Sequence, residues 1–169
     1  MSSTKNSEQL RAGYERVFTV TDYYDGPRRG IADYRGRPHF YDCVFDSKND
    51  EYSDLYLLTP LEQTAFELAL EDWEIWCRWE MAFHQGKTSL DTHPCQPQDR
   101  SRHEELAETL RGALKTNPDT ALKRIGQFKV LGTPNLPKGV LRPLQVKWAS
   151  PLDLDDREKN LDTPTVLLY

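Results

Sequence analysis

Hydrophobic and polar residues follow two different periods along the chain, and each period predicts a different part of the fold. Between residues 17 and 58, short segments rich in β-branched and aromatic residues are separated by turn residues such as Asp25-Gly26-Pro27. Connections this short favour an antiparallel meander. The segments that predict strands are 17–24, 30–34, 39–46 and 55–58.

The third of these segments carries bulky residues on both of its faces. Phe40 and Val44 fall on one face, whereas Tyr41, Cys43 and Phe45 fall on the other. Bulky residues on both faces are typical of a strand that is buried on both sides. We therefore expect a central strand that is covered by a helix.

A helical period begins at about residue 60 and continues to about residue 85. Thr59 and Glu62 are spaced as a capping box, and Pro60 would occupy the first helical position. Gly86 supplies a left-handed stop. The apolar arc of this tryptophan-rich helix is wider than half its circumference, so it needs two partner surfaces, a sheet and another helix.

The second half of the chain predicts a further helix and weaker strands. The helix covers about 99–115, with a thin apolar stripe. A short helical piece at 120–125 precedes strand-like segments at 127–131 and 140–148, and Pro143 within the latter indicates an edge strand or a bulge.

These elements predict one α+β domain with an antiparallel meander sheet of about four to six strands. The long helix and the second helix pack against this sheet. We expect a flexible N-terminal tail at 1–13, the domain at 14–149, and an acidic C-terminal extension with an apolar end at 150–169.

Composition narrows the class of protein. The chain has 37% hydrophobic residues and a net charge of −5, which argues against wholesale coating of nucleic acid. It has no apolar run long enough for a membrane span and no apolar stretch typical of a secretion signal. Three cysteines without a C-x-x-C pair favour a reduced, cytoplasmic protein.

Two carboxylates interrupt the apolar arc of the long helix. Asp72 and Glu80 both fall among its tryptophans. Burial of a carboxylate raises its pKa, which is one route to acid–base catalysis. The alternative, which the sequence favours, is structural: each carboxylate accepts a hydrogen bond from an arginine, a backbone N–H or an indole N–H.

Histidines raise the question of a metal site. Glu80 and His84 are one helical turn apart, and His93 and His103 follow within 20 residues. These are suitable zinc ligands, but their spacing matches no metal motif, and His93 equally fits a polar turn. We therefore predict neither a metal nor a cofactor, and keep these four residues as weak candidates.

Arginines gather in one short segment together with tyrosines. Arg28, Arg29, Arg35 and Arg37 fall within ten residues, and Tyr24 lies close by. Arginine with exposed aromatic rings suits phosphate or nucleic acid, and it suits an acidic protein surface equally well. The simpler interpretation is that these are solvated turn residues or partners of glutamates on the long helix.

No phosphate-binding loop, dinucleotide fingerprint or nucleophile elbow is present. The favoured hypothesis is thus a small interaction or adaptor protein without catalytic activity, which binds another protein. It would use the acidic helix face, the arginine-rich turns or the extended C-terminal segment. The alternative is a small hydrolase or metal-assisted enzyme that uses Asp72, Glu80 and His84. The second alternative is nucleic-acid or phosphate binding through the four arginines.

Overall fold

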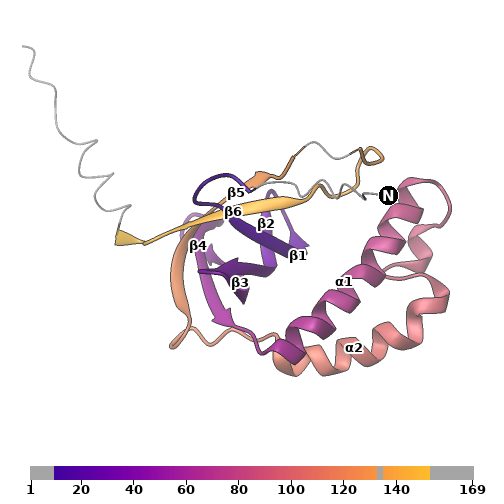
Figure 1. Ribbon diagram of the computed structural model, residues 1–169, viewed down its shortest axis with the longest axis horizontal. Coiled ribbons are helices and arrows are strands. Elements are labelled where there is room, and N and C mark those ends of the chain that lie inside the picture. The colour runs from indigo at the N-terminus through magenta and orange to yellow at the C-terminus, as the bar shows by residue number, and fades with distance from the viewer. Residues whose placement is uncertain (1–9, 133–134, 153–169) are drawn as a thin grey trace, which may run out of the picture.

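The computed structural model describes residues 10–132 and 135–152, which form a β-barrel beside a pair of helices (Figure 1). Six antiparallel strands follow one another around the barrel in chain order. They are β1 (Glu15–Tyr23), β2 (Pro27–Tyr34), β3 (Arg37–Asp46), β4 (Glu51–Pro60), β5 (Leu122–Val130) and β6 (Leu144–Ala149).

The antiparallel α+β prediction is confirmed, but the sheet is closed into a barrel, which the sequence did not predict. Closure comes from pairing between the first and last strands, with Glu15 opposite Val146 and Arg16 opposite Gln145. A closed barrel has no edge strand, so Pro143 does not mark one. Pro143 instead precedes β6, and its carbonyl accepts the Leu131 N–H at 2.8 Å.

Large aromatic side chains fill the barrel interior. Tyr41 and Tyr56 pack edge to face at 5.9 Å between ring centroids, and both also contact Phe128 and Trp148. The polar atoms are satisfied by backbone carbonyls: the Tyr41 hydroxyl donates to Thr19 O, for example, at 2.8 Å. The barrel is therefore a packed core rather than a ligand cavity.

The helical layer is inserted between β4 and β5. It contains α1 (Gln63–His84) and α2 (Arg100–Ala113), with short 3-10 turns between them. Both predicted helices are confirmed, with slightly shorter bounds. Among the described residues, neither helix is long and apolar enough to cross a membrane. Gly86 adopts a φ of 73° and ends α1 as predicted, with Lys87 N–H donating to Ala82 O.

The predicted capping box is wrong. Thr59 and Pro60 belong to β4, where they pair with Phe40 and His39 of β3. Strand pairing thus continues to the residue before Leu61 and outcompetes the local capping signal. The helix begins after Glu62 with no side-chain cap, and the buried Thr59 hydroxyl has no hydrogen-bond partner among the described residues.

Two further local predictions are wrong. Residues 122–125 belong to β5 and pair with β4, so the short helix predicted at 120–125 does not form. Phe45 does not share the buried face of Tyr41 and Cys43, because a bulge between Cys43 and Phe45 turns its ring outward, where it is 48% exposed.

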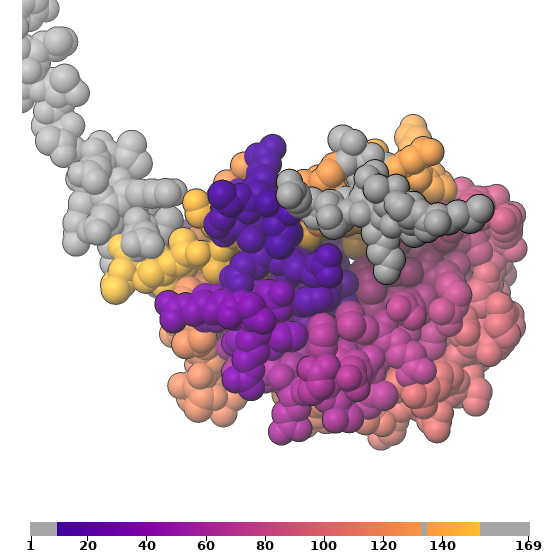
Figure 2. All heavy atoms as spheres, viewed as in Figure 1, coloured from indigo at the N-terminus to yellow at the C-terminus, as the bar shows by residue number. Residues whose placement is uncertain are grey.

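The two layers meet through a shared hydrophobic cluster, and Figure 2 shows the helices against the indigo and purple strands of the barrel. Ile31 and Phe40 contribute from the outer face of the barrel, Ala69 and Ile75 from α1, and Leu106 from α2. The third predicted strand is thus covered on both faces, and α1 has the two partner surfaces that its wide apolar arc predicted. Most of the predicted N-terminal tail and C-terminal extension lies outside the described residues.

Candidate functional site

A cavity of about 780 Å³ lies between the barrel and the helical layer. Its walls come from the outer surface of the first three strands, from α1 and α2, and from the segment 139–144 that leads into β6. Two of its polar lining residues, Asp72 and Glu80, are the carboxylates that interrupt the apolar arc of α1. The tryptophans and histidines of its lining are Trp73, Trp76, His93 and His103.

Asp72 is paired with a histidine of the second helix. His103 Nδ1 lies 2.6 Å from Asp72 Oδ1, and both side chains are about three-quarters buried. A carboxylate only accepts hydrogen bonds, so Nδ1–H is the donor. His103 Nε2 has no hydrogen-bond partner among the described residues. This arrangement fixes the orientation of an imidazole and leaves one nitrogen available for proton transfer.

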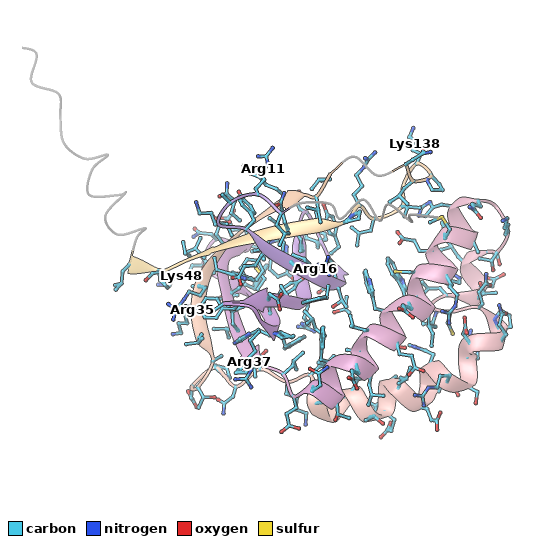
Figure 3. All side chains as sticks on the ribbon, viewed as in Figure 1. Arg11, Arg16, Arg35, Arg37, Lys48 and Lys138 are labelled. Carbon is cyan, nitrogen blue, oxygen red and sulfur yellow. The ribbon has the colours of Figure 1, made fainter. Side chains whose placement is uncertain are left out.

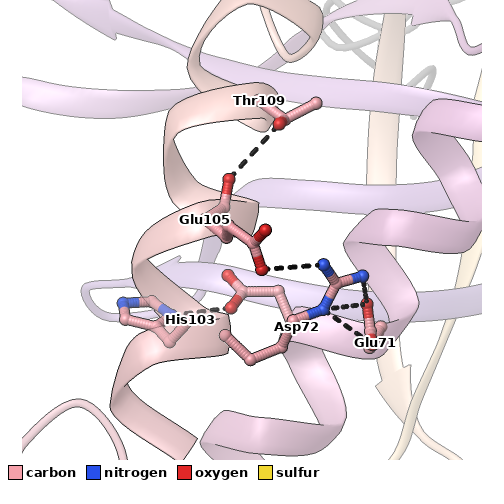
Figure 4. A network of polar contacts seen from close by, with 6 residues as sticks. Glu71, Asp72, His103, Glu105 and Thr109 are labelled. Atoms are coloured by element: carbon pink, nitrogen blue, oxygen red, sulfur yellow. Dashed lines mark hydrogen bonds and ion pairs between the residues drawn. The ribbon is translucent and has the colours of Figure 1, made fainter.

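The antiparallel packing of α1 and α2 brings this pair together. Figure 4 shows Glu71 and Asp72 of α1 beside His103 and Glu105 of α2. Arg102 bridges Glu71 and Glu105 in the same network, at 2.7 and 3.1 Å. Of these two ion pairs only the one between Arg102 and Glu71 joins the two helices, since Glu105 also belongs to α2. Both pairs are solvent-accessible, whereas the histidine pair borders the cavity.

Two stacked tryptophans form part of the cavity wall. The rings of Trp73 and Trp76 lie 4.8 Å apart with an interplanar angle of 25°. Both side chains are half-buried, and neither indole N–H has a hydrogen-bond partner among the described residues. By contrast, Trp79 donates to Thr92 and Trp148 donates to Asp33 O. The cavity therefore presents aromatic surface and unused donors.

Glu80 connects α1 to the segment over the cavity. Its Oε1 accepts the Leu141 N–H at 2.8 Å and lies 3.9 Å from His84 Nε2. Burial raises the pKa of Glu80, as its position in the arc predicted, while the Leu141 hydrogen bond and His84 act in the opposite direction. His84 does not line the cavity; its ring packs against Gly139.

The metal candidates are distributed rather than clustered. His103 pairs with Asp72, whereas His84 pairs with Glu80, two turns further along α1 and thus about 12 Å away along its axis. His93 is exposed and contacts the edge of the Trp79 ring. Within residues 10–132 and 135–152, no three His, Cys, Asp or Glu side chains are grouped so that they could hold a metal ion.

The four arginines of the segment 28–37 lie in two separate pairs. Arg28 and Arg29 lie at the start of β2 and Arg35 and Arg37 beyond its end, about 20 Å away at the usual rise of a strand. Arg28 donates to the carbonyls of Tyr24 and Asp25 within its own turn, and Arg29 pairs with Asp42.

Arg35 and Arg37 point outward from the barrel, away from the cavity (Figure 3). Tyr24 is 71% exposed, at the same end of the barrel as Arg28. The four arginines therefore do not form one continuous patch, although each pair remains a candidate surface.

No cysteine is set up as a nucleophile. Burial raises the pKa of Cys43 and of Cys95, and it raises the pKa of Cys77 to about 11. Cysteine chemistry requires a thiolate, which a raised pKa disfavours. The titratable groups among the described residues that line the cavity are the carboxylates, the imidazoles, the exposed Tyr23 and the exposed Arg142.

Sequence reasoning found both carboxylates but missed three parts of the site. It placed His103 only among metal ligands, treated Trp73 and Trp76 as core, and gave the segment 139–144 no role. A signal for His103 exists: in an antiparallel helical pair, residues that come earlier in α1 face residues that come later in α2. Arg78 pairs with Asp99, and Asp72, six residues earlier, pairs with His103, four residues later.

No known family matches the chain, and neither the curated proteins nor the solved structures compared with it give a match. The site's own geometry therefore carries the functional argument.

Proposed function

We propose that this protein binds a small organic molecule in the cavity between the barrel and the helices, and that Asp72 and His103 perform acid–base chemistry on it. The observation that carries this proposal is the cavity itself. Its volume of about 780 Å³ lies within the usual range for small-molecule sites, and its lining combines apolar walls with a few polar groups.

The chemistry follows from the hydrogen bond between Asp72 and His103. With Nδ1 committed to the carboxylate, the neutral imidazole keeps an unprotonated Nε2 that accepts a proton from a ligand or from water. The carboxylate then stabilises the imidazolium that forms. This differs from the enzyme predicted from sequence, because His103 replaces His84 as the histidine that acts.

The adaptor hypothesis remains a separate prediction. Its extended C-terminal segment lies mostly outside the described residues, and Arg28 and Arg29 already have partners on the barrel surface, in the β1–β2 turn and at Asp42. Nucleic-acid binding through the arginines also remains a prediction, with Arg35 and Arg37 as its exposed pair.

Fluorine NMR of protein labelled with 5-fluorotryptophan tests binding directly, because the chain has four tryptophans in different environments. Titration with a library of small organic fragments should shift the Trp73 and Trp76 resonances, which Trp→Phe variants assign. Trp148 lies inside the barrel and serves as the internal control. If no fragment shifts the two cavity resonances, or if Trp148 shifts equally, the binding proposal fails.

The acid–base part needs its own test. Fragments that bind are incubated with the protein and followed by proton NMR for chemical change. His103→Gln should lower the conversion rate about 100-fold or more while binding is retained. Arg111→Gln, at an exposed position of α2, is the matched control and should have no effect. If wild type and His103→Gln convert the fragment at equal rates, the acid–base role of His103 is wrong, although the binding proposal stands.

A further inference from the structure

The charged residues that line the cavity differ in the sign of their charge and in how deeply they are buried. Asp72 and Glu80 both belong to its wall, and Glu80 is only 7% exposed. Arg142 is the one lysine or arginine among the described lining residues, and it is exposed to solvent. Asp72 already has His103 as its partner. Within the part of the chain that the structure describes, the carboxylate of Glu80 thus has no lysine or arginine as a partner, and only His84 lies near it.

Only one of the two carboxylate oxygens of Glu80 accepts a hydrogen bond from a described residue. Its Oε1 accepts the Leu141 N–H, whereas its Oε2 makes no hydrogen bond to any described residue. His84 Nε2 is 3.9 Å from Oε1, too far for a good hydrogen bond. Because Thr59 Oγ1 is the only fully buried side-chain polar atom without a partner among the described residues, Oε2 is accessible, and a ligand can bring it a positively charged donor.

Aromatic surface lies next to this carboxylate. Trp76 is four residues before Glu80 on α1, so their side chains share one face of the helix. Trp73 stacks on Trp76, and both rings line the cavity together with Asp72. An indole face beside a carboxylate attracts ammonium groups, because the ring quadrupole and the negative charge act together.

We propose that the ligand of this cavity is an organic cation, an amine or a quaternary ammonium compound with an apolar or aromatic portion. Its charge lies at Glu80, and its apolar portion lies along Trp76 and Trp73. This inference rests on the proposed function and adds the chemical class of the ligand. Anionic molecules, including phosphorylated ones, are disfavoured by the same carboxylates.

Three probes of nearly equal size separate charge from shape: phenethylamine as the cation, 2-phenylethanol as the neutral compound and 3-phenylpropanoate as the anion. Each is titrated into the full-length 5-fluorotryptophan protein at neutral pH, and the shifts of Trp73 and Trp76 give the dissociation constants. We expect the cation to bind about tenfold more tightly than the anion, or more, with the neutral probe between them.

Glu80→Gln tests the assigned carboxylate. The amide oxygen still accepts the Leu141 N–H, so the fold is retained, and the preference for the cation should fall to about threefold or less. Glu74→Gln is the matched control, because Glu74 is exposed on the same helix. Glu80→Asp keeps the charge and should keep the preference. Melting curves and the Trp148 resonance report the fold of each variant.

The outcomes are distinguishable. If the neutral probe or the anion binds as tightly as the cation, the ligand class is wrong while small-molecule binding stands. If Glu80→Gln still binds the cation in preference to the anion, the positive charge of the ligand does not lie at Glu80, and the role assigned to Glu80 is wrong. If none of the probes shifts Trp73 or Trp76, the organic-cation inference fails, and failure of the whole fragment library would also remove the proposed function.

Discussion

Gly139 lies in the segment 139–144 of the cavity wall and packs against His84 of α1. Its φ is 93°, and a Cβ built there would lie 2.8 Å from Cε1 and 2.9 Å from Nδ1 of His84. Two residues later, the Leu141 N–H forms the hydrogen bond to Glu80. Gly139→Ala should therefore lift this segment from α1 without unfolding the barrel.

The expected cost has two parts. A side chain with positive φ costs about 1–2 kcal/mol. Relief of the contact requires the His84 ring to leave its preferred rotamer, at about 0.5–1.5 kcal/mol. The sum is about 1.5–3.5 kcal/mol of local stability. Gly36→Ala isolates the first part, because Gly36 has a φ of 74° and no atom within 4 Å of its built Cβ.

Hydrogen exchange at the Leu141 amide measures the effect. A cost of about 1.5–3.5 kcal/mol should accelerate that exchange roughly 10- to 300-fold, since each 1.4 kcal/mol is a factor of ten. In a His84→Ala background, where no ring opposes the added methyl group, the acceleration by Gly139→Ala should fall to the part due to φ alone. Gly36→Ala should leave Leu141 exchange unchanged and lower global stability by about 1–2 kcal/mol.

Two outcomes would refute this reasoning. Unchanged exchange at Leu141 in Gly139→Ala would mean that the contact with His84 does not hold the segment. An equal acceleration with and without the His84 ring would mean that backbone conformation alone accounts for the cost.

Three other substitutions have defined directions. Gly126→Ala should lower the free energy of unfolding by about 2 kcal/mol or more in urea denaturation, because its Cβ would lie 2.8 Å from the Trp148 ring and 2.9 Å from that of Tyr56. Gly112→Ala, in α2 with no atom nearby, should raise it by about 0.5 kcal/mol. For Glu80, the raised pKa means that the folded chain retains this proton to a higher pH than the unfolded chain. Wild-type stability should therefore decline as pH rises from the ordinary value of 4.5 through the raised value, and Glu80→Gln should lose this component of the decline.

The sequence predicted the elements whose signals are local. The apolar period of α1 and the stop at Gly86 do not depend on distant residues, and both are confirmed. The strands before α1 were found because β-branched and aromatic runs alternate with turns. The capping box failed because Thr59-Pro60-Leu61-Glu62 satisfies the local rule equally well in a strand, and pairing with β3 decided between the two.

Barrel closure could not be predicted in the same way. It depends on the pairing of Glu15 with Val146, which are more than a hundred residues apart in sequence. No local pattern encodes such a pairing, and an open sheet would show the same alternation. Gly126 is one residue whose identity is explained by the closed barrel, because the absence of a side chain leaves space for Trp148 and Tyr56 in the barrel interior. The meaning of that glycine is apparent only once the strands surround a common axis.

In the candidate site, too, the residues predicted from sequence are those whose signal comes from their own helix. Asp72 and Glu80 were noticed because a carboxylate in an apolar arc is anomalous on its own helix. His103 and Leu141, which are their partners, come from elements that follow at a distance and carry no anomaly of their own. A sequence thus reveals which side chains need a partner more readily than it reveals the partner.

Neighbouring residues of α1 illustrate why the cavity exists at all. Ile75 is only 2% exposed and packs in the cluster that joins α1 to Leu106 of α2 and Ile31 of the barrel. Trp76, the next residue, points about 100° away around the helix and remains half-buried at the cavity wall. The barrel interior is filled by its own aromatic residues, so it offers no space for this indole. A surface that neither layer covers is left between them, so the packed core and the proposed binding site lie on adjacent faces of one helix.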